Sequence, residues 1–155
     1  MWKSLLKTLF KLTLVILFCF YTFISCDNTD CITFSTRTLI IDFLDAETGD
    51  PLSRSFDWIT ATESGVLFYG DTTLSTLYLP VNTDQDQTTF LFSNPDNSLD
   101  TLEIGYLKTE RLISKDCGFE LQFKNIEVIS TTFGNVVTVK NELSRLNEEN
   151  IKIFL

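Results

Sequence analysis

Apolar and polar residues alternate along much of the chain beyond residue 30. This period of two is typical of strands with one buried face, because successive side chains of a strand point to opposite faces. The denser apolar run of residues 38–43 indicates a strand covered on both faces. The clearest alternating runs are Leu77 and Leu79, Phe90 and Phe92, Leu102, Ile104 and Tyr106, and Phe119, Leu121 and Phe123.

Turn-forming residues separate these runs at intervals of about 10 to 15 residues. Many short strands with regular turns predict an all-β fold after an N-terminal signal helix, namely an antiparallel sandwich or barrel of about eight or nine strands. The string Asp45-Ala46-Glu47-Thr48-Gly49-Asp50-Pro51-Leu52 is similar to the first hairpin of transthyretin-like and collagen-adhesin B-type sandwiches, and this likeness favours an antiparallel β-sandwich. The stretch 140–150 fits either a short helix or a long loop. The turn strings are Thr48-Gly49-Asp50-Pro51, Gly70-Asp71, residues 82–86, Asn94-Pro95-Asp96-Asn97 and Gly134-Asn135.

The first 25 residues have the pattern of a bacterial secretion signal. Three lysines precede an apolar run of residues 12–24, and no acidic residue occurs among them. The run is shorter than the roughly 20 apolar residues that span a bilayer core. The junction Phe23-Ile24-Ser25-Cys26 resembles a lipobox, although Phe23 stands where Leu is usual. We expect cleavage before Cys26 and lipidation of its thiol. The alternative is an uncleaved signal anchor with an incidental cysteine.

This assignment divides the chain into a signal peptide (1–25), a short tether (26–30) and a single sandwich domain (31–155). Lipid on Cys26 would anchor the domain to a membrane of the cell envelope, which we expect to be the outer membrane, without a transmembrane helix. The signal takes three of the 12 basic residues and none of the 21 acidic ones, so the mature charge is 9 − 21 = −12. Because such a surface repels phosphate backbones, we expect no nucleic-acid partner.

Two of the four cysteines remain for the mature domain, because Cys19 leaves with the signal and Cys26 would carry lipid. Thiols of exported proteins pair in an oxidising compartment. We therefore predict a disulfide between Cys31 and Cys117. The alternative is a pair of buried free thiols.

The chain has no histidine, which excludes Ser-His-Asp and Cys-His catalytic arrangements and every histidine-based zinc site. It also lacks the G-x-S-x-G, P-loop and G-x-G-x-x-G strings. We therefore predict a protein that is not an enzyme and that needs no cofactor and no metal. A hydrolase that uses two Asp or Glu carboxylates is the alternative that composition leaves open.

Two groups of residues have both a functional and a structural interpretation. Six side chains could offer oxygen ligands to calcium from loops, but Asn and Asp are also the ordinary residues of turns. Four aromatic side chains could form a platform for glycan or peptide, but in a sandwich they are more often core. The oxygen-bearing residues are Asn82, Asp84, Asp86, Asn94, Asp96 and Asp100, and the aromatic ones are Phe56, Trp58, Tyr69 and Tyr78.

The order of several short motifs resembles a family of short Bacteroidota lipoproteins of unknown function. The resemblance implies an envelope location without implying a reaction, and it supports the pairing of Cys31 with Cys117. Two short strings, Asp71-Thr72-Thr73 and Asp100-Thr101-Leu102, resemble the O-glycosylation sequon of Bacteroidota, which makes Thr72 and Thr101 candidate acceptors. The motifs that carry the family resemblance are Cys31, Leu79-Pro80-Val81-Asn82-Thr83, Thr88-Thr89-Phe90-Leu91-Phe92, residues 100–106, Cys117-Gly118-Phe119 and Asn150-Ile151-Lys152-Ile153-Phe154.

Anchoring near a bilayer raises the effective concentration of a domain against other envelope components. We therefore expect a non-catalytic binding or assembly module whose partner is an envelope protein or glycan. The alternative is the small envelope hydrolase with Asp and Glu carboxylates.

Overall fold

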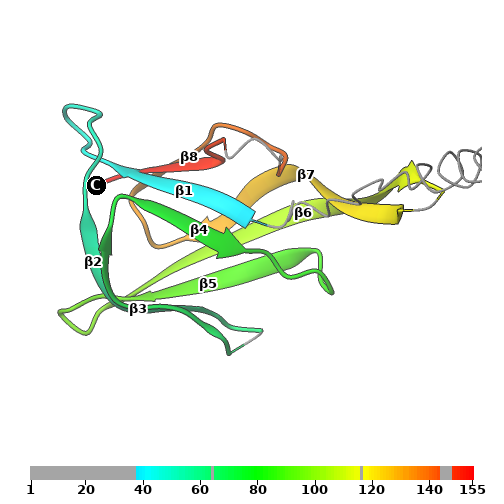
Figure 1. The fold of residues 1–155 in the computed structure, drawn as a ribbon. Helices are drawn as coiled ribbons and strands as arrows, with labels where there is room; N and C mark the ends of the chain where they lie inside the picture. The colour runs from blue at the N-terminus through cyan, green and yellow to red at the C-terminus, as the bar shows by residue number, and fades with distance from the viewer. Residues whose placement is uncertain (1–37, 64, 116, 144–147) are drawn as a thin grey trace, which may run out of the picture. The chain divides into compact units, whose positions relative to one another are not determined.

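The computed structural model describes residues 38–63, 65–115, 117–143 and 148–155. The predicted signal peptide (1–25), the tether (26–30) and Cys31 lie outside this part of the chain. Within it, no helix has the length and apolarity needed to cross a membrane. The described residues form nine strands: β1 (Thr38–Leu44), β2 (Arg54–Ala61), β3 (Leu67–Leu74), β4 (Thr76–Pro80), β5 (Gln87–Ser93), β6 (Leu99–Ser114), β7 (Gly118–Thr131), β8 (Asn135–Thr138) and β9 (Ile151–Phe154) (Figure 1).

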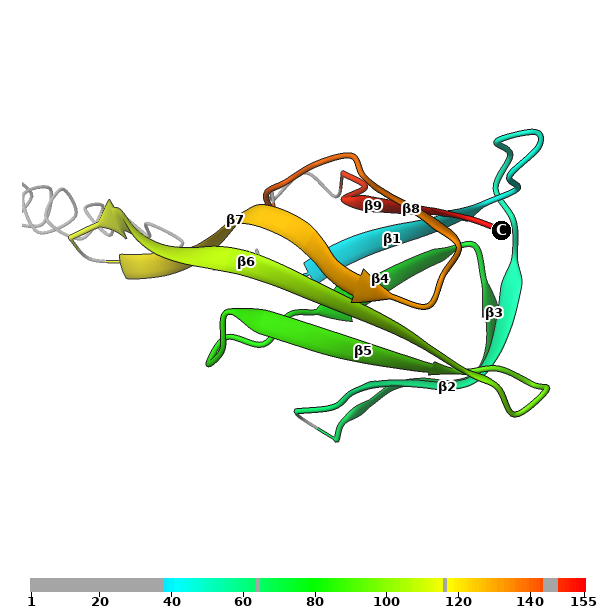
Figure 2. The same cartoon turned by 180° about the vertical axis from the view of Figure 1, so that it is seen from behind.

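The strands form two facing sheets, as the predicted sandwich requires. The first has the order β4-β1-β9-β8 and the second the order β3-β2-β5-β6-β7. Figure 2 shows the two layers from the back. One pair departs from the predicted antiparallel arrangement, because β1 runs parallel to β9, with Ile41 opposite Ile151. The reason is that β9 returns antiparallel to β8 and inserts between β8 and β1.

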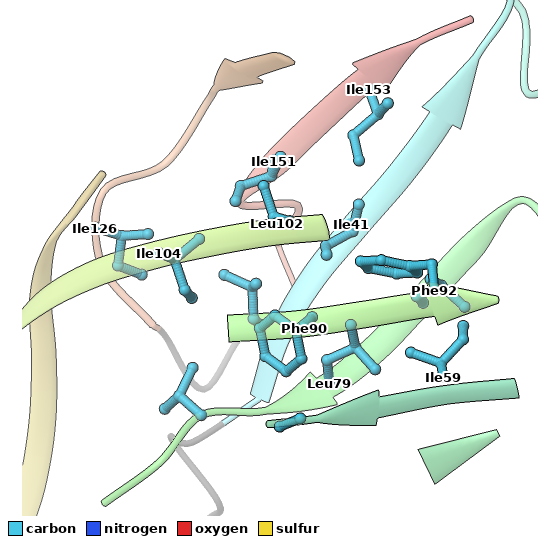
Figure 3. Close-up of a cluster of buried hydrophobic side chains, with 14 of the residues drawn as sticks. Ile41, Ile59, Leu79, Phe90, Phe92, Leu102, Ile104, Ile126, Ile151 and Ile153 are labelled. Atoms are coloured by element: carbon cyan, nitrogen blue, oxygen red, sulfur yellow. The ribbon is translucent and has the colours of Figure 1, made fainter. Parts of the chain in front are cut away.

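The alternating runs place their apolar side chains between the two sheets. Figure 3 shows Ile41 and Ile153 of the four-stranded sheet near Phe90 and Phe92 of the five-stranded sheet. All four side chains are fully buried. Burial of such a side chain stabilises a fold by about 1.5–3 kcal/mol. The predicted double-covered strand is confirmed, since even Ile40, on the outer face of β1, is only 6% exposed.

Most of the predicted turns join strands. In the loop after β1, the Asp45 carboxylate accepts hydrogen bonds from the backbone N–H groups of Glu47 (2.9 Å) and Thr48 (2.8 Å), and Gly49 supplies a φ of 76°. The predicted turn at Gly70-Asp71 is wrong, because both residues lie inside β3, where Gly70 stands opposite Trp58 of β2. Asp71 adopts a φ of 41°, a conformation that Asp tolerates better than most residues, so the strand continues through it.

The stretch 140–150 is a loop wherever the structure describes it. Its backbone binds the edge of β7: Leu143 N–H donates to the Phe123 carbonyl at 3.0 Å. Asn150, which is 2% exposed, connects this loop to the other sheet. Its Oδ1 accepts from Ile40 N–H at 3.0 Å, and its Nδ2 donates to the Glu142 carbonyl at 2.9 Å. The loop therefore closes the gap between β7 and the four-stranded sheet.

Candidate functional site

Strands β6 and β7 are longer than the short strands that the sequence predicts. They have 16 and 14 residues, and their pairing continues until Ser114 stands opposite Gly118. Strand β5 pairs with β6 only as far as Gly105. Beyond that point the two strands form a ribbon that projects from one end of the sandwich (Figures 1 and 2). We call residues 107–115 and 117–123 of this ribbon the arm.

The arm has two different faces. Tyr106 and Phe123 are buried at its base, with ring centroids 5.3 Å apart. Because side chains alternate along a strand, the directly paired Leu112 and Phe119 lie on this same face, which we call the inward face. Their exposed fractions are 53% and 67%. The alternation of Phe119, Leu121 and Phe123 predicted that all three would lie on a buried face. That prediction is wrong for Phe119, which lies beyond the opposing sheet.

The opposite, outward face of the arm continues the outer face of the five-stranded sheet. A register shift at the base accompanies a positive φ of 51° at Asn125, as expected for a β-bulge in β7. Just inside it, Gly105 is covered by Ile129, whose Cδ1 would lie 3.0 Å from a Cβ at position 105. Because Gly105 has no side chain, Ile129 can lie over it. Leu107, two residues further along β6 on the same face, and Ile129 are 53% and 50% exposed, and we call these two residues the outward patch.

The loop before β5 holds the base of the arm. The Tyr106 hydroxyl donates to the Asn82 carbonyl at 2.6 Å, and Lys108 Nζ donates to the Thr83 carbonyl at 3.2 Å. Lys108 also pairs with the Asp86 carboxylate at 3.2 Å. The Asn82 side chain accepts from Asp84 N–H at 2.8 Å, which is the bond of an Asx turn. The loop of residues 82–86, whose composition would also suit calcium, is therefore engaged in fixing the arm.

The other three oxygen-bearing residues considered for calcium lie at the other end of the sandwich. Asp100 binds Arg54 Nη2 at 2.6 Å and accepts from Asn94 Nδ2 at 2.8 Å, while Asp96 accepts from Ser98 N–H at 2.9 Å. The six residues therefore do not come together in one site. In the described part of the chain, no three His, Cys, Asp or Glu side chains are placed to share a metal ion.

The four aromatic residues do not form a platform. Phe56 belongs to the core. Trp58 and Tyr78 are exposed, but they lie in different sheets. The Tyr69 hydroxyl accepts from Tyr78 N–H at 3.2 Å, so it occupies a donor that the edge strand β4 would otherwise present to another chain.

Three residues of the predicted modification sites, Cys117, Thr72 and Thr101, lie in the described part of the chain. Cys117 lies in the turn at the tip of the arm, where its N–H donates to Ser114 Oγ at 3.0 Å. Thr72, on the edge strand β3, and Thr101, in β6, are both half-buried. Because Cys26 and Cys31 lie outside the described residues, lipidation and the disulfide stay predictions. Glycosylation of the two threonines also stays a prediction.

Among the described residues, the surface is hollowed in places. One, of about 310 Å³, lies at the base of the arm between the β2–β3 hairpin and the loop after β4, with Phe68 and Val81 among its apolar lining and Glu63 and Asp84 at its rim. The other, of about 440 Å³, is lined by Val139, Lys140, Glu148 and Glu149.

A pair of carboxyl groups adjoins the second hollow. Burial raises the pKa of Asp42, and a hydrogen bond from Lys152 lowers the pKa of Glu149, which also hydrogen-bonds Asp42. Lys152 Nζ lies 3.0 Å from Glu149 Oε1. Two neighbouring carboxyl groups with pKa values shifted in opposite directions are the arrangement that acid–base chemistry uses, although ion pairs in structural networks cause the same shifts.

Residues 58–155 match DUF6452, a family described as being of unknown function. The chain belongs to the DUF6452 family. The match covers 98 of the 155 residues, from β2 to the end of the chain, and so includes the whole arm. No curated protein and no solved structure matches the chain. Membership in DUF6452 confirms the expectation of a family of unknown function.

The arm was not predicted from the sequence. Two long alternating runs, 99–114 and 118–131, are separated by only three residues, and this spacing is a signal for a long hairpin. The exposure of Leu112 and Phe119 could not be predicted in this way. Alternation shows to which face of a strand a side chain points, but it does not show how far the opposing sheet extends.

Proposed function

We propose that the mature chain is a lipid-anchored lipoprotein of the cell envelope, held by Cys26 in the outer membrane of a Bacteroidota cell. The support is the lipobox-like junction before Cys26, the short apolar run ahead of it and the resemblance of the motif order to Bacteroidota lipoproteins. Within the envelope, the domain acts as a non-catalytic binding or assembly module.

The observation that carries the binding role is the arm. A two-stranded ribbon without a third strand is only marginally stable in water, so its persistence beyond a filled core calls for additional contacts. In the outward patch, Leu107 is the first residue of the arm and Ile129 lies on the adjoining part of β7. Both are about half exposed, and Gly105 makes room for Ile129. Contiguous exposed apolar side chains mark interaction sites more often than scattered ones do. We therefore place the partner surface on the outward patch.

The test of this surface is copurification from cells. The double substitution L107E/I129E puts two charges into the outward patch, while V137E puts one on β8 of the other sheet, at a residue that is 45% exposed. The partner that copurifies with the unmodified chain should be lost with the double variant and retained with V137E. If both variants keep the same partner, or both lose it, the outward patch is not the binding surface.

The envelope location has a separate test. Replacing Cys26 with Ala should abolish lipidation and cleavage, so the variant should keep residues 1–25 and accumulate as the unlipidated precursor. A mature N-terminus other than residue 26, or partitioning of the unmodified mature protein into the aqueous phase of a detergent extraction, would contradict the lipoprotein assignment. Far-ultraviolet spectra of both forms should report the same β-rich fold.

The alternative is a small envelope hydrolase, for which Asp42 and Glu149 are the favoured pair. The specific observation is their hydrogen bond and opposite pKa shifts beside the 440 Å³ hollow. If purified protein cleaves an envelope polysaccharide or peptide, and D42N or E149Q removes that activity while L107E/I129E does not, the hydrolase replaces the binding module.

A further inference from the structure

The hollow at the base of the arm has an apolar wall and an acidic opening. Its volume of about 310 Å³ is at the lower end of the range for small-molecule sites. Ala61 and Val81 are buried in its wall, and the half-buried ring of Phe68 also lines it. The lining further includes Glu63 and Asp84, which are both exposed. A group that enters the hollow therefore meets carboxylates at the opening and apolar side chains inside.

The polar groups of the wall are bonded to one another. The hydroxyl of Thr88, a residue that is 1% exposed, accepts from Asn82 N–H at 2.8 Å and shares a hydrogen bond of 2.7 Å with the Tyr106 hydroxyl. The Tyr106 hydroxyl in turn donates to the Asn82 carbonyl at 2.6 Å. Because these groups have partners within the domain, the wall favours an apolar group over a polar one.

Neither carboxylate of the opening forms an ion pair within the described part of the chain. Lys108, which binds the adjoining loop, is paired with Asp86 instead. The field of these acids reaches the wall, because burial first, and then the negative charges of Glu63 and Asp86, raise the pKa of the Tyr106 hydroxyl. The opening therefore attracts a positive charge that the described residues do not supply.

An apolar wall behind an acidic opening suits a cation with an apolar tail. The tail would displace water from the wall, which is favourable in proportion to the apolar area that leaves water. The cationic head would stay hydrated at the opening, beside the two carboxylates. A lysine side chain of a partner protein fits less well, because it would enter with its charge first and place that charge against the apolar wall.

We propose that this hollow binds a small primary amine with a short apolar tail, whose ammonium group lies beside the carboxylates of Glu63 and Asp84. The amine site includes neither residue of the outward patch, and it requires neither lipidation nor a protein partner. It therefore goes beyond the proposed binding or assembly role.

The test is a titration of the full chain, purified in nonionic detergent, with n-butylammonium chloride. The methyl NMR signals of Ala61 and Val81 should shift until the site is saturated, because both side chains line the hollow. Two analogues separate the two parts of the ligand. The compound 1-butanol keeps the tail without the charge, and methylammonium keeps the charge without the tail. Each analogue should bind at least fivefold more weakly than butylammonium.

A pair of double variants tests the carboxylates. E63Q/D84N removes both charges of the opening and keeps the size of the side chains, so it should lower the affinity for butylammonium at least fivefold. The matched control E47Q/D50N removes the same net charge from the loop after β1, and its affinity should stay within twofold of that of the unmodified chain. All four residues are exposed, so both variants should fold, and their methyl spectra report whether they do.

Several results would overturn the amine site. They are the absence of a saturable shift at Ala61 and Val81, binding of either analogue as tightly as butylammonium, and an equal loss of affinity in the two double variants, which would show a response to net charge alone. None of these measurements involves the outward patch or a cellular partner. A failed amine site is therefore distinguishable from a failed binding module.

Discussion

Asn150 is the residue whose replacement tests most directly how the two sheets are joined. It is 2% exposed, and its side chain bonds Ile40 N–H at 3.0 Å and the Glu142 carbonyl at 2.9 Å. In N150A, the Ile40 N–H stays buried without a partner, which costs about 1–3 kcal/mol, and the loss of the second bond costs about 1 kcal/mol, because water can reach the exposed Glu142. The free energy of unfolding should therefore fall by about 2–4 kcal/mol in urea titrations.

The N150D variant separates this explanation from a simple loss of volume. A carboxylate can accept from Ile40 N–H but cannot donate to the Glu142 carbonyl, whereas the protonated acid can do both. The loss of stability should therefore be larger at pH 7 than at pH 4. The matched control is N141D, because Asn141 lies on the exposed side of the same loop. If N150A costs less than 1 kcal/mol, or if N150D is equally destabilised at both pH values, Asn150 does not join the sheets in this way.

Three further predictions concern the core, a salt bridge and a buried carboxyl group. F92A should cost about 3–5 kcal/mol in urea unfolding, because Phe92 is fully buried with ring contacts on two sides, whereas V137A at an exposed site should stay within about 0.5 kcal/mol. R54M should lower the free energy of unfolding by about 1–3 kcal/mol, because Arg54 binds Asp100 at 2.6 Å. A double-mutant cycle with D100N should show a coupling energy of about 1 kcal/mol, and the absence of coupling would mean that the ion pair does not contribute to stability. Because burial raises the pKa of Asp42 above 3.8, the folded state binds its proton more tightly than the unfolded state does, so the contribution of Asp42 to stability should fall as the pH rises from 3.8 through the folded pKa. The free energy of unfolding measured against that of D42N, whose side chain does not titrate, should therefore fall over this range, and a constant difference would refute the assignment.

The fold class was predictable from the sequence because most of the apolar side chains alternate with polar ones. Leu77 and Leu79, or Phe90 and Phe92, could be buried together only by strands with a common inner face. The direction of β9 was not predictable. A strand of four residues with two buried isoleucines fits beside a parallel or an antiparallel neighbour, and the choice depends on its partner β8.

Less of the candidate site could be predicted from the sequence. The loop containing Asn82 and Asp86 has the composition of a calcium loop, but its contacts with Tyr106 and Lys108 depend on a strand that lies some twenty residues later in the sequence. The turn predicted at Gly70 is wrong because Gly70-Asp71 favours a turn only locally. In the structure, pairing with β2 outweighs this local preference.

In-cell photo-crosslinking from position 107 shows whether the outward patch binds an envelope partner. Benzoylphenylalanine in place of Leu107 samples the outward patch in the intact envelope, and the same residue in place of Val137 samples an exposed site of the other sheet. We expect a discrete product with one envelope protein or glycan from position 107, absent from position 137 and absent when Cys26 is replaced by Ala. No specific product from position 107, or the same products from both positions, would show that the domain is not a binding module that uses this surface.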